Sequence, residues 1–218
     1  LMALSATSAE RLAHARLSGT ASLRVFRALL DAASRPGTIT RLPGRRDDIP
    51  AVLYPALALV DLDHRVTVLG ADAGSEWPAL VRAATGASAD DGPDGIGHAD
   101  VVVCFRPPTP DEITTLRRGT ASAPEHGARL IVAARAISEE PLPVDGDGAS
   151  VELRGPGVAG FRTVAVDGVG DDVFAALADV NRDFPVGVDT WIVADDGAVV
   201  AVPRSTRPER STDDREEH

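Results

Sequence analysis

The chain has 218 residues, 44% of them hydrophobic, and carries a formal net charge of −11. This length is enough for one well-buried domain and too short for two domains of ordinary size. Because so acidic a surface repels phosphate backbones and anionic lipids, the composition argues against nucleic-acid and membrane partners.

The first predicted elements are helices. Residues 8–18 form a weak amphipathic stretch, and Thr20 is a candidate N-cap for a stronger helix that stops at Pro36-Gly37. The helix is indicated by four apolar residues at helical spacing, Leu23, Phe26, Leu30 and Ala33. A third apolar segment covers residues 50–60.

Helical and strand patterns alternate through the rest of the chain. Helices are predicted over residues 77–84, 110–117 and 171–182. Strands are predicted over seven segments, residues 65–69, 99–105, 129–134, 150–154, 161–166, 188–194 and 198–202. The last two strands form a hairpin at Asp195-Asp196-Gly197.

This order of elements predicts an α/β fold. We expect a single domain over residues 1–206, with one mixed sheet of about seven strands covered by helices. Residues 207–218 are charged and lack apolar anchors, which predicts a disordered tail.

The basic residues narrow the chemistry, because all 22 are Arg and the chain contains no Lys. A Schiff base with pyridoxal phosphate is therefore excluded, and any cationic contact to phosphate must come from Arg. The single cysteine, Cys104, lies in an apolar run and is better interpreted as core packing than as a nucleophile. The histidines are scattered, so we expect neither a metal site nor any other bound cofactor.

The first candidate site is the end of the last predicted strand. Pro203 ends the strand, so that Arg204, Ser205 and Thr206 leave the sheet at a position where α/β proteins commonly hold ligands. The alternative is that Arg204 forms a structural ion pair with Asp189. The sequence leaves both interpretations open.

A second candidate lies in the glycine-rich segment of residues 155–160, which fits the G-x-G-x-x-G pattern. A strand is predicted after it where a dinucleotide site needs a helix, so a turn between strands is favoured. The N–H groups of Gly155 and Gly157 could still form part of an anion-binding nest.

A third candidate is the segment that contains Gly119, Thr120 and Glu125, between a predicted helix and a predicted strand. It is either a turn fixed by glycine and proline or a docking surface for a partner subunit. No grouping of Ser, His and Asp in the sequence is specific enough to name a nucleophile and its base.

Four blocks of sequence resemble one known family in the same order along the chain. The strongest is residues 183–191 with 202–206, which contains Gly187 and Asp189 and ends in Pro203-Arg204-Ser205-Thr206. The others are residues 26–30 with 35–37, residues 119–128 and residues 153–158. Together they resemble the H subunit of the bacterial carbon-phosphorus lyase system (PhnH) over residues 20–206.

This resemblance implies a fold similar to the large domain of pyridoxal-phosphate-dependent transferases, in architecture alone because the chain has no lysine. It also implies a homodimer when the chain is alone and assembly with G, I and J subunits. In that complex, an alkylphosphonate such as methylphosphonate displaces adenine from ATP to give a ribose 1-phosphonate 5-triphosphate. The family has no known catalytic residue in this subunit.

Two hypotheses of different classes follow. The chain is a non-catalytic or co-catalytic subunit of this core complex, inactive as an enzyme on its own. Alternatively, it is a stand-alone phosphate- or nucleotide-binding protein, or an enzyme, that uses the strand end at Arg204. With no signal peptide and no apolar run long enough to cross a bilayer, we expect a cytoplasmic location in either case.

Overall fold

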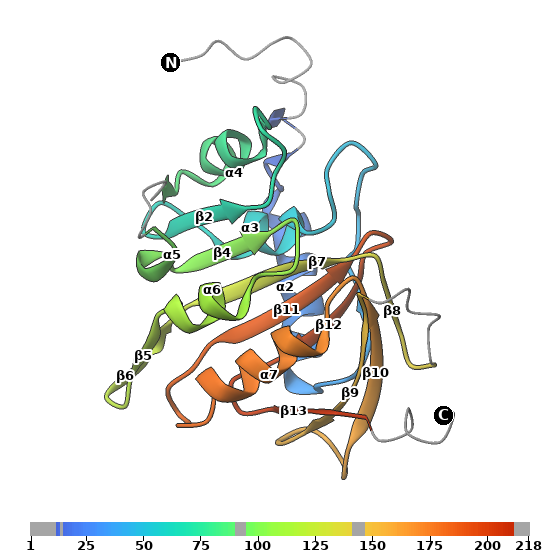
Figure 1. The fold of residues 1–218 in the computed structure, drawn as a ribbon. Helices are drawn as coiled ribbons and strands as arrows, with labels where there is room; N and C mark the ends of the chain where they lie inside the picture. Colours follow the sequence, from blue (N-terminus) through green and yellow to red (C-terminus); the bar gives the residue numbers. More distant parts are fainter. Residues whose placement is uncertain (1–11, 14, 90–94, 141–146, 212–218) are drawn as a thin grey trace.

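The computed structural model describes residues 12–13, 15–89, 95–140 and 147–211. Its centre is a mixed sheet of seven strands in the order β1-β12-β11-β7-β4-β2-β3 (Figure 1). Five strands run parallel, namely β2 (Arg65–Leu69), β3 (Ser88–Ala89), β4 (Val101–Cys104), β7 (Arg129–Ala134) and β11 (Asp189–Ala194). One edge is completed by β12 (Ala198–Val202), which pairs antiparallel with β11, and by β1 (Thr40–Arg41), which pairs antiparallel with β12.

Alternation along the central strands produces two separate hydrophobic cores. On β4, Val101 and Val103 face one cluster of buried side chains, whereas Val102 and Cys104 face the other. All four residues are fully buried, as expected for a parallel strand that is covered on both faces. The predicted mixed α/β sheet with helices is confirmed.

Helices cover the first face of the sheet. They are α2 (Gly19–Ser34), α3 (Leu53–Leu59) and α4 (Trp77–Thr85). The N-cap of α2 is Ser18, whose hydroxyl accepts a hydrogen bond from Ala21 N, so the prediction of Thr20 as the cap was two residues late. The indole of Trp191 on β11 donates to the carbonyl of Leu29 at 3.1 Å and ties α2 to the sheet.

Three of the four apolar residues whose spacing predicted α2 lie outside its buried face, and only Ala33 packs against the core. The buried residues of α2 are Val25, Leu29 and Ala32, whereas Leu23, Phe26 and Leu30 are exposed. The helix carries apolar side chains on two faces, and only one of them packs against the sheet. Residues 8–11 and 14 of the weak helix expected over residues 8–18 lie outside the described residues.

The second face of the sheet is covered by helices and by a second sheet. The helices are α5 (Gly95–His98), α6 (Pro110–Thr115) and α7 (Asp171–Val180). The second sheet has the order β13-β9-β10-β8, formed by β13 (Arg207–Arg210), β9 (Ala149–Arg154), β10 (Arg162–Asp167) and β8 (Ala136–Ser138).

This second sheet changes two expectations. The predicted strands over residues 150–154 and 161–166 exist, but they belong to the second sheet, and the short strands β1 and β3 complete the first. The expected disorder from residue 207 is wrong for Arg207–Arg210, because β13 pairs antiparallel with β9. Residues 212–218 lie outside the described part of the chain.

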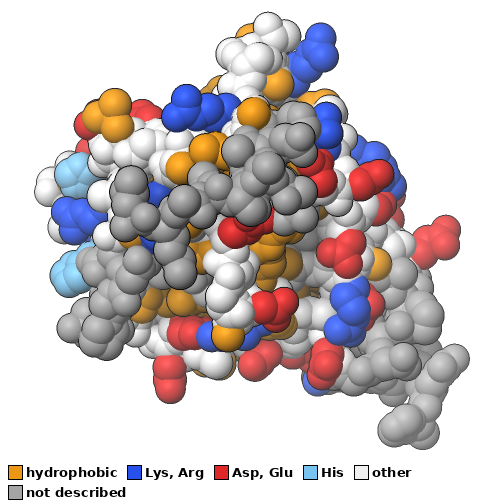
Figure 2. Space-filling view, turned by 90° about the horizontal axis from the view of Figure 1, so that it is seen from above, with side chains coloured by type: hydrophobic (Ala, Val, Ile, Leu, Met, Phe, Trp, Pro, Cys, Tyr) orange, Lys and Arg blue, Asp and Glu red, His pale blue; other side chains and the backbone are white. Residues whose placement is uncertain are grey.

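A two-stranded hairpin formed by β5 (Arg118–Thr120) and β6 (Ala123–Gly127) extends from the body of the molecule (Figure 1). The sequence predicted this segment as the connection between a helix and a strand. Within the described residues, no helix has the length and apolarity needed to cross a membrane. On the face seen in Figure 2, the coloured acidic and basic side chains are interspersed, without one continuous basic patch.

Candidate functional site

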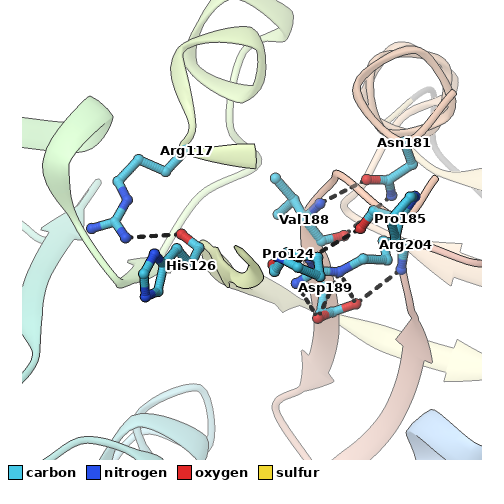
Figure 3. A network of polar contacts seen from close by, with 8 residues as sticks. All are labelled: Arg117, Pro124, His126, Asn181, Pro185, Val188, Asp189 and Arg204. Carbon is cyan, nitrogen blue, oxygen red and sulfur yellow. Dashed lines mark hydrogen bonds and ion pairs between the residues drawn. The ribbon is translucent and has the colours of Figure 1, made fainter. Parts of the chain in front are cut away.

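Arg204 and Asp189 form a close ion pair at one end of the main sheet (Figure 3). The Arg204 side chain is 12% exposed and that of Asp189 is 31% exposed. Arg204 Nη2 donates to Asp189 Oδ2 at 2.6 Å, and its Nε lies 3.1 Å from both carboxylate oxygens. The backbone N–H of Arg204 also donates to Asp189 Oδ1 at 3.0 Å. The sequence left open whether Arg204 binds a ligand or pairs with Asp189, and the structure contains the ion pair with Asp189.

The remaining donors of Arg204 hold two distant segments. Its Nη1 donates to the carbonyl of Pro124 on β6 and lies 3.5 Å from the carbonyl of Pro185. The two segments approach so closely that a side chain at Gly127 would meet the Arg204 guanidinium at 2.9 Å. The guanidinium therefore joins the hairpin, the segment before β11 and the end of β12.

Asn181, at the end of α7, fixes the same region from the other side. Its side-chain amide donates to Val188 O at 3.1 Å, and its Oδ1 accepts from Val188 N at 2.7 Å. A side chain at Gly187 would meet both this amide and the Cβ of Arg204. Sequence reasoning placed Gly187 near the site and missed Asn181, which has no motif to mark it.

The position of Arg204 in the sheet argues against the ligand site that its strand end predicted. β12 runs antiparallel to β11, and Thr190 near the start of β11 pairs with Val202 at the end of β12. Arg204 therefore lies at the amino edge of the parallel strands, whereas open α/β sheets hold ligands at the carboxyl edge. Since its donors are directed at internal acceptors, Arg204 is a structural residue here.

Ser205 and Thr206 belong to the turn that follows Arg204. Thr206 N donates to the carbonyl of Pro203 at 2.8 Å, and the carbonyl of Ser205 lies against Gly155. Thr206 is 1% exposed, and its hydroxyl has no hydrogen-bond partner among the described residues. It lines a pocket of about 310 Å³ with the end of α7 and the start of β13.

The glycine-rich segment after β9 is a tightly packed turn between strands β9 and β10. A side chain at Gly155 would lie 2.7 Å from the carbonyl oxygen of Ser205, and one at Gly157 would collide with the carbonyl oxygen of Ser34 at the end of α2. These close approaches explain the glycines without a ligand, so the structure favours the turn over an anion-binding nest.

Gly119, Thr120 and Glu125 all lie on the β5–β6 hairpin, which also contains Pro124, one of the acceptors in the Arg204 network. Thr120 Oγ1 accepts from Ala123 N at 3.1 Å, and a side chain at Gly119 would lie 2.9 Å from the carbonyl of Pro124. These contacts fix the turn of the hairpin. Glu125 is exposed. The base of the hairpin is held by Arg117, which donates to His126 O at 2.9 Å (Figure 3). Arg117 also pairs with Asp100 at 2.8 Å.

Comparison with known proteins decides what this arrangement belongs to. The model of one family, described as bacterial phosphonate metabolism protein (PhnH), matches residues 18–209. The chain belongs to the PhnH family. The resemblance seen in four sequence blocks is thereby confirmed.

A curated PhnH relative gives the same result. The chain is 33% identical over 192 residues to a protein of Rhizobium meliloti (strain 1021) named alpha-D-ribose 1-methylphosphonate 5-triphosphate synthase subunit PhnH. The alignment covers 85% of this chain and 89% of the relative.

The carboxyl edge of this PhnH-family sheet holds a second arginine pair, which sequence reasoning missed. From β2 the chain adds β3 on one side of the sheet and then β4 on the other side, although all three strands are parallel. The gap between β2 and β4 is therefore a topological switch point, where open α/β sheets commonly bind ligands. There Arg106 binds Glu112 with both ends of its guanidinium, at 2.8 and 2.6 Å. This pairing lowers the pKa of Glu112 below its ordinary value and raises that of Arg106.

Cys104 precedes this pair on β4 and is fully buried. Burial raises the pKa of its thiol to about 12, so the reactive thiolate is not populated near neutral pH. The interpretation of Cys104 as a core residue is consistent with this environment. Among the described residues, no group of three or more His, Cys, Asp or Glu side chains is placed to hold a metal ion.

Proposed function

We propose that this chain is the H subunit of an assembly that forms ribose 1-methylphosphonate 5-triphosphate from ATP and an alkylphosphonate in phosphonate catabolism. The support is the PhnH family match over residues 18–209 and the name of its relative, a subunit of the corresponding synthase. Its proposed partners are the G, I and J counterparts.

We further propose that its role is non-catalytic or co-catalytic. The observation that supports this most strongly is the Arg204 network, because the charged residues that the family signature singles out bind each other and backbone carbonyls. Such residues stabilise a shape that partners can recognise. The alternative, a stand-alone phosphate- or nucleotide-binding protein or an enzyme that uses the strand end at Arg204, has less support, because the Arg204 guanidinium is paired with Asp189.

Two finer points also come from the family resemblance and are proposals here. The isolated chain is a homodimer, and its fold is similar to the large domain of pyridoxal-phosphate-dependent transferases. Size-exclusion chromatography with light scattering tests the first point directly.

The test of the proposed function is co-expression of the tagged chain with its G, I and J counterparts. Co-elution of all four as one species is expected, together with conversion of ATP and methylphosphonate to the triphosphate product. Omission of this chain is expected to abolish product formation. If the other three subunits assemble and form product without it, the proposal fails.

A further inference from the structure

Helix α2 exposes an apolar stripe to solvent. Leu23, Phe26 and Leu30 are 46%, 42% and 55% exposed, and their spacing of three and four residues puts them on one side of the helix. The core face of the same helix is formed by Val25, Leu29 and Ala32. The three exposed side chains are therefore surplus to the packing of this domain, and a contiguous stripe of this kind marks an interaction surface.

A groove runs beside the stripe. It has a volume of about 890 Å³ and lies between α2 and the edge strand β1, with Leu30 contributing to both the stripe and the groove. Its wall contains Arg27, Ala28 and Asp31 from the helix and Thr38 to Arg41 from the following segment. An apolar stripe bordered by a groove is the geometry that receives an amphipathic helix.

The charges along α2 indicate what this partner must carry. Arg24 and Arg27 are exposed and form no ion pair with any described residue, whereas Asp31 is already paired with Arg35. The face is thus locally cationic on a chain whose formal net charge is −11. Its complement is an apolar surface edged by carboxylates.

A second copy of this chain is a poor occupant. The stripe matches itself when two α2 helices run antiparallel about an axis between Phe26 and Arg27, so that Leu23 faces Leu30 of the other copy. That arrangement brings the two Arg27 side chains together at the centre with no free carboxylate beside them. Like charges at the centre of an interface oppose association.

We propose that the α2 face, defined by Leu23, Phe26, Arg27 and Leu30, docks an amphipathic helix of another subunit, with an apolar stripe edged by Asp or Glu. This inference rests on the proposed function, because it names the surface through which the H subunit joins its complex. The aromatic ring and the two leucines at the centre supply the binding energy, and the arginines at the rim supply orientation.

The experiment uses co-expression of the complete set of subunits with a tagged I counterpart. Phe26→Asp and Leu30→Asp each place a charge in the docking stripe. Both positions are exposed, so the variants are expected to keep the urea midpoint and the circular dichroism of the parent chain. Leu62→Asp is the matched control, since Leu62 is an exposed leucine that lies beside Gly86 and does not line the groove.

Recovery of the chain with the tagged subunit is expected to fall about tenfold or more for Phe26→Asp and Leu30→Asp. The Leu62→Asp control is expected to be recovered like the parent chain. Arg27→Glu is expected to reduce recovery at low ionic strength, with a smaller effect at about 0.5 M salt because rim charges are screened. Arg182→Glu, another exposed arginine, controls for the change in net charge.

Three results would overturn the inference. Folded Phe26→Asp and Leu30→Asp chains that co-purify at the parent level would show that this face is not the docking surface. The same would follow if Leu62→Asp lost as much recovery as the stripe variants. Conversion of a dimeric isolated chain to a monomer by Phe26→Asp, with full recovery in the complex, would assign the stripe to self-association. If the parent chain itself failed to co-purify with the tagged subunit, the proposed function would be refuted instead.

Discussion

At the scale of single residues, Arg204 shows how a polar family signature can serve the fold. Five of its side-chain hydrogen bonds reach Asp189, Pro185 and Pro124, and Pro124 is far from the other two in the sequence. Lysine could keep the charge but not this planar fork, which reaches acceptors in several directions at once.

Arg204→Ala is expected to lower the free energy of unfolding by about 3–5 kcal/mol, because it leaves Asp189 mostly buried without its partner. The measurement is urea denaturation followed by tryptophan fluorescence. Arg182→Ala is the control, since Arg182 is 72% exposed and its pair with Asp179 should contribute less than about 1 kcal/mol. Equal effects of the two substitutions would refute the structural role of Arg204.

The Arg106–Glu112 pair predicts a dependence of stability on pH. Because the folded-state pKa of Glu112 is lowered by Arg106, the pair stabilises the fold above the ordinary pKa of about 4.5. That contribution is lost as the pH falls through the folded-state pKa. Glu112→Gln, which can still serve the capping box with Thr109, is expected to be less stable than the parent at pH 7.

Urea midpoints of the parent and Glu112→Gln should therefore converge as the pH is lowered below about 4. Glu125→Gln provides the control, because Glu125 is exposed on the hairpin and forms no ion pair with a described residue. A difference between parent and Glu112→Gln that stays constant with pH would contradict the ionic origin of the effect.

At the scale of elements, the turn between β9 and β10 contains two glycines that need the same backbone conformation but have different neighbours. Gly157 and Gly160 both have left-handed backbones, with φ of +82° and +78°. A side chain at Gly157 collides with the end of α2, whereas one at Gly160 meets nothing within 4 Å. The two glycines thus share a conformational requirement and differ only in their neighbours.

Gly160→Ala is expected to cost about 1–2 kcal/mol for the left-handed conformation alone. Gly157→Ala should cost measurably more, because the Ser34 carbonyl must also move. Thermal unfolding of the two variants tests the difference. If both variants lose the same stability, the contact between this turn and α2 is not a tight one.

The sequence predicted the main helices and strands, but not which face of α2 is buried or which sheet β9 and β10 join. Helix α6 could be foreseen because Thr109 and Glu112 form its capping box, which is a local signal. The buried face of α2 could not be chosen correctly, because Leu23, Phe26 and Leu30 have the same helical spacing as Val25 and Leu29. Similarly, alternation predicts strands β9 and β10 but carries no information about which sheet they join.

The candidate site was predictable to the same extent. Pairing of Arg204 with Asp189 could be anticipated from complementary side chains, and it was one of two interpretations. The carbonyls of Pro124 and Pro185 could not, because a backbone acceptor carries no residue-specific signature. The hairpin predicted at Asp195-Asp196-Gly197 already makes β12 antiparallel to β11. It does not reveal that β11 runs parallel to β7, and this pairing is what places Arg204 at the amino edge of the parallel strands.

At the scale of the whole molecule, β13, the last strand in the described part of the chain, forms one edge of the second sheet. β13 pairs with β9 from Arg207 to Arg210, and Ser211 N donates to Ser150 O at 2.9 Å. Truncation after Thr206 removes these hydrogen bonds and uncovers the edge of β9. We expect a loss of about 2 kcal/mol or more, which lowers Tm by about 4–8 °C.

Truncation after Ser211 is the matched comparison, since it keeps every contact described for β13. It is expected to leave Tm unchanged, as measured by differential scanning calorimetry. Equal Tm values for the two truncated chains would show that β13 contributes nothing to stability.

The two-sided burial of the central sheet also determines how the molecule can open. Strands β4, β7 and β11 send alternate side chains into both hydrophobic clusters, so neither cluster can disperse while the other keeps these strands in place. Their amide protons should therefore exchange with solvent deuterium only through unfolding of the entire chain. The short edge strands β1 and β3 should exchange through local fraying, many orders of magnitude faster.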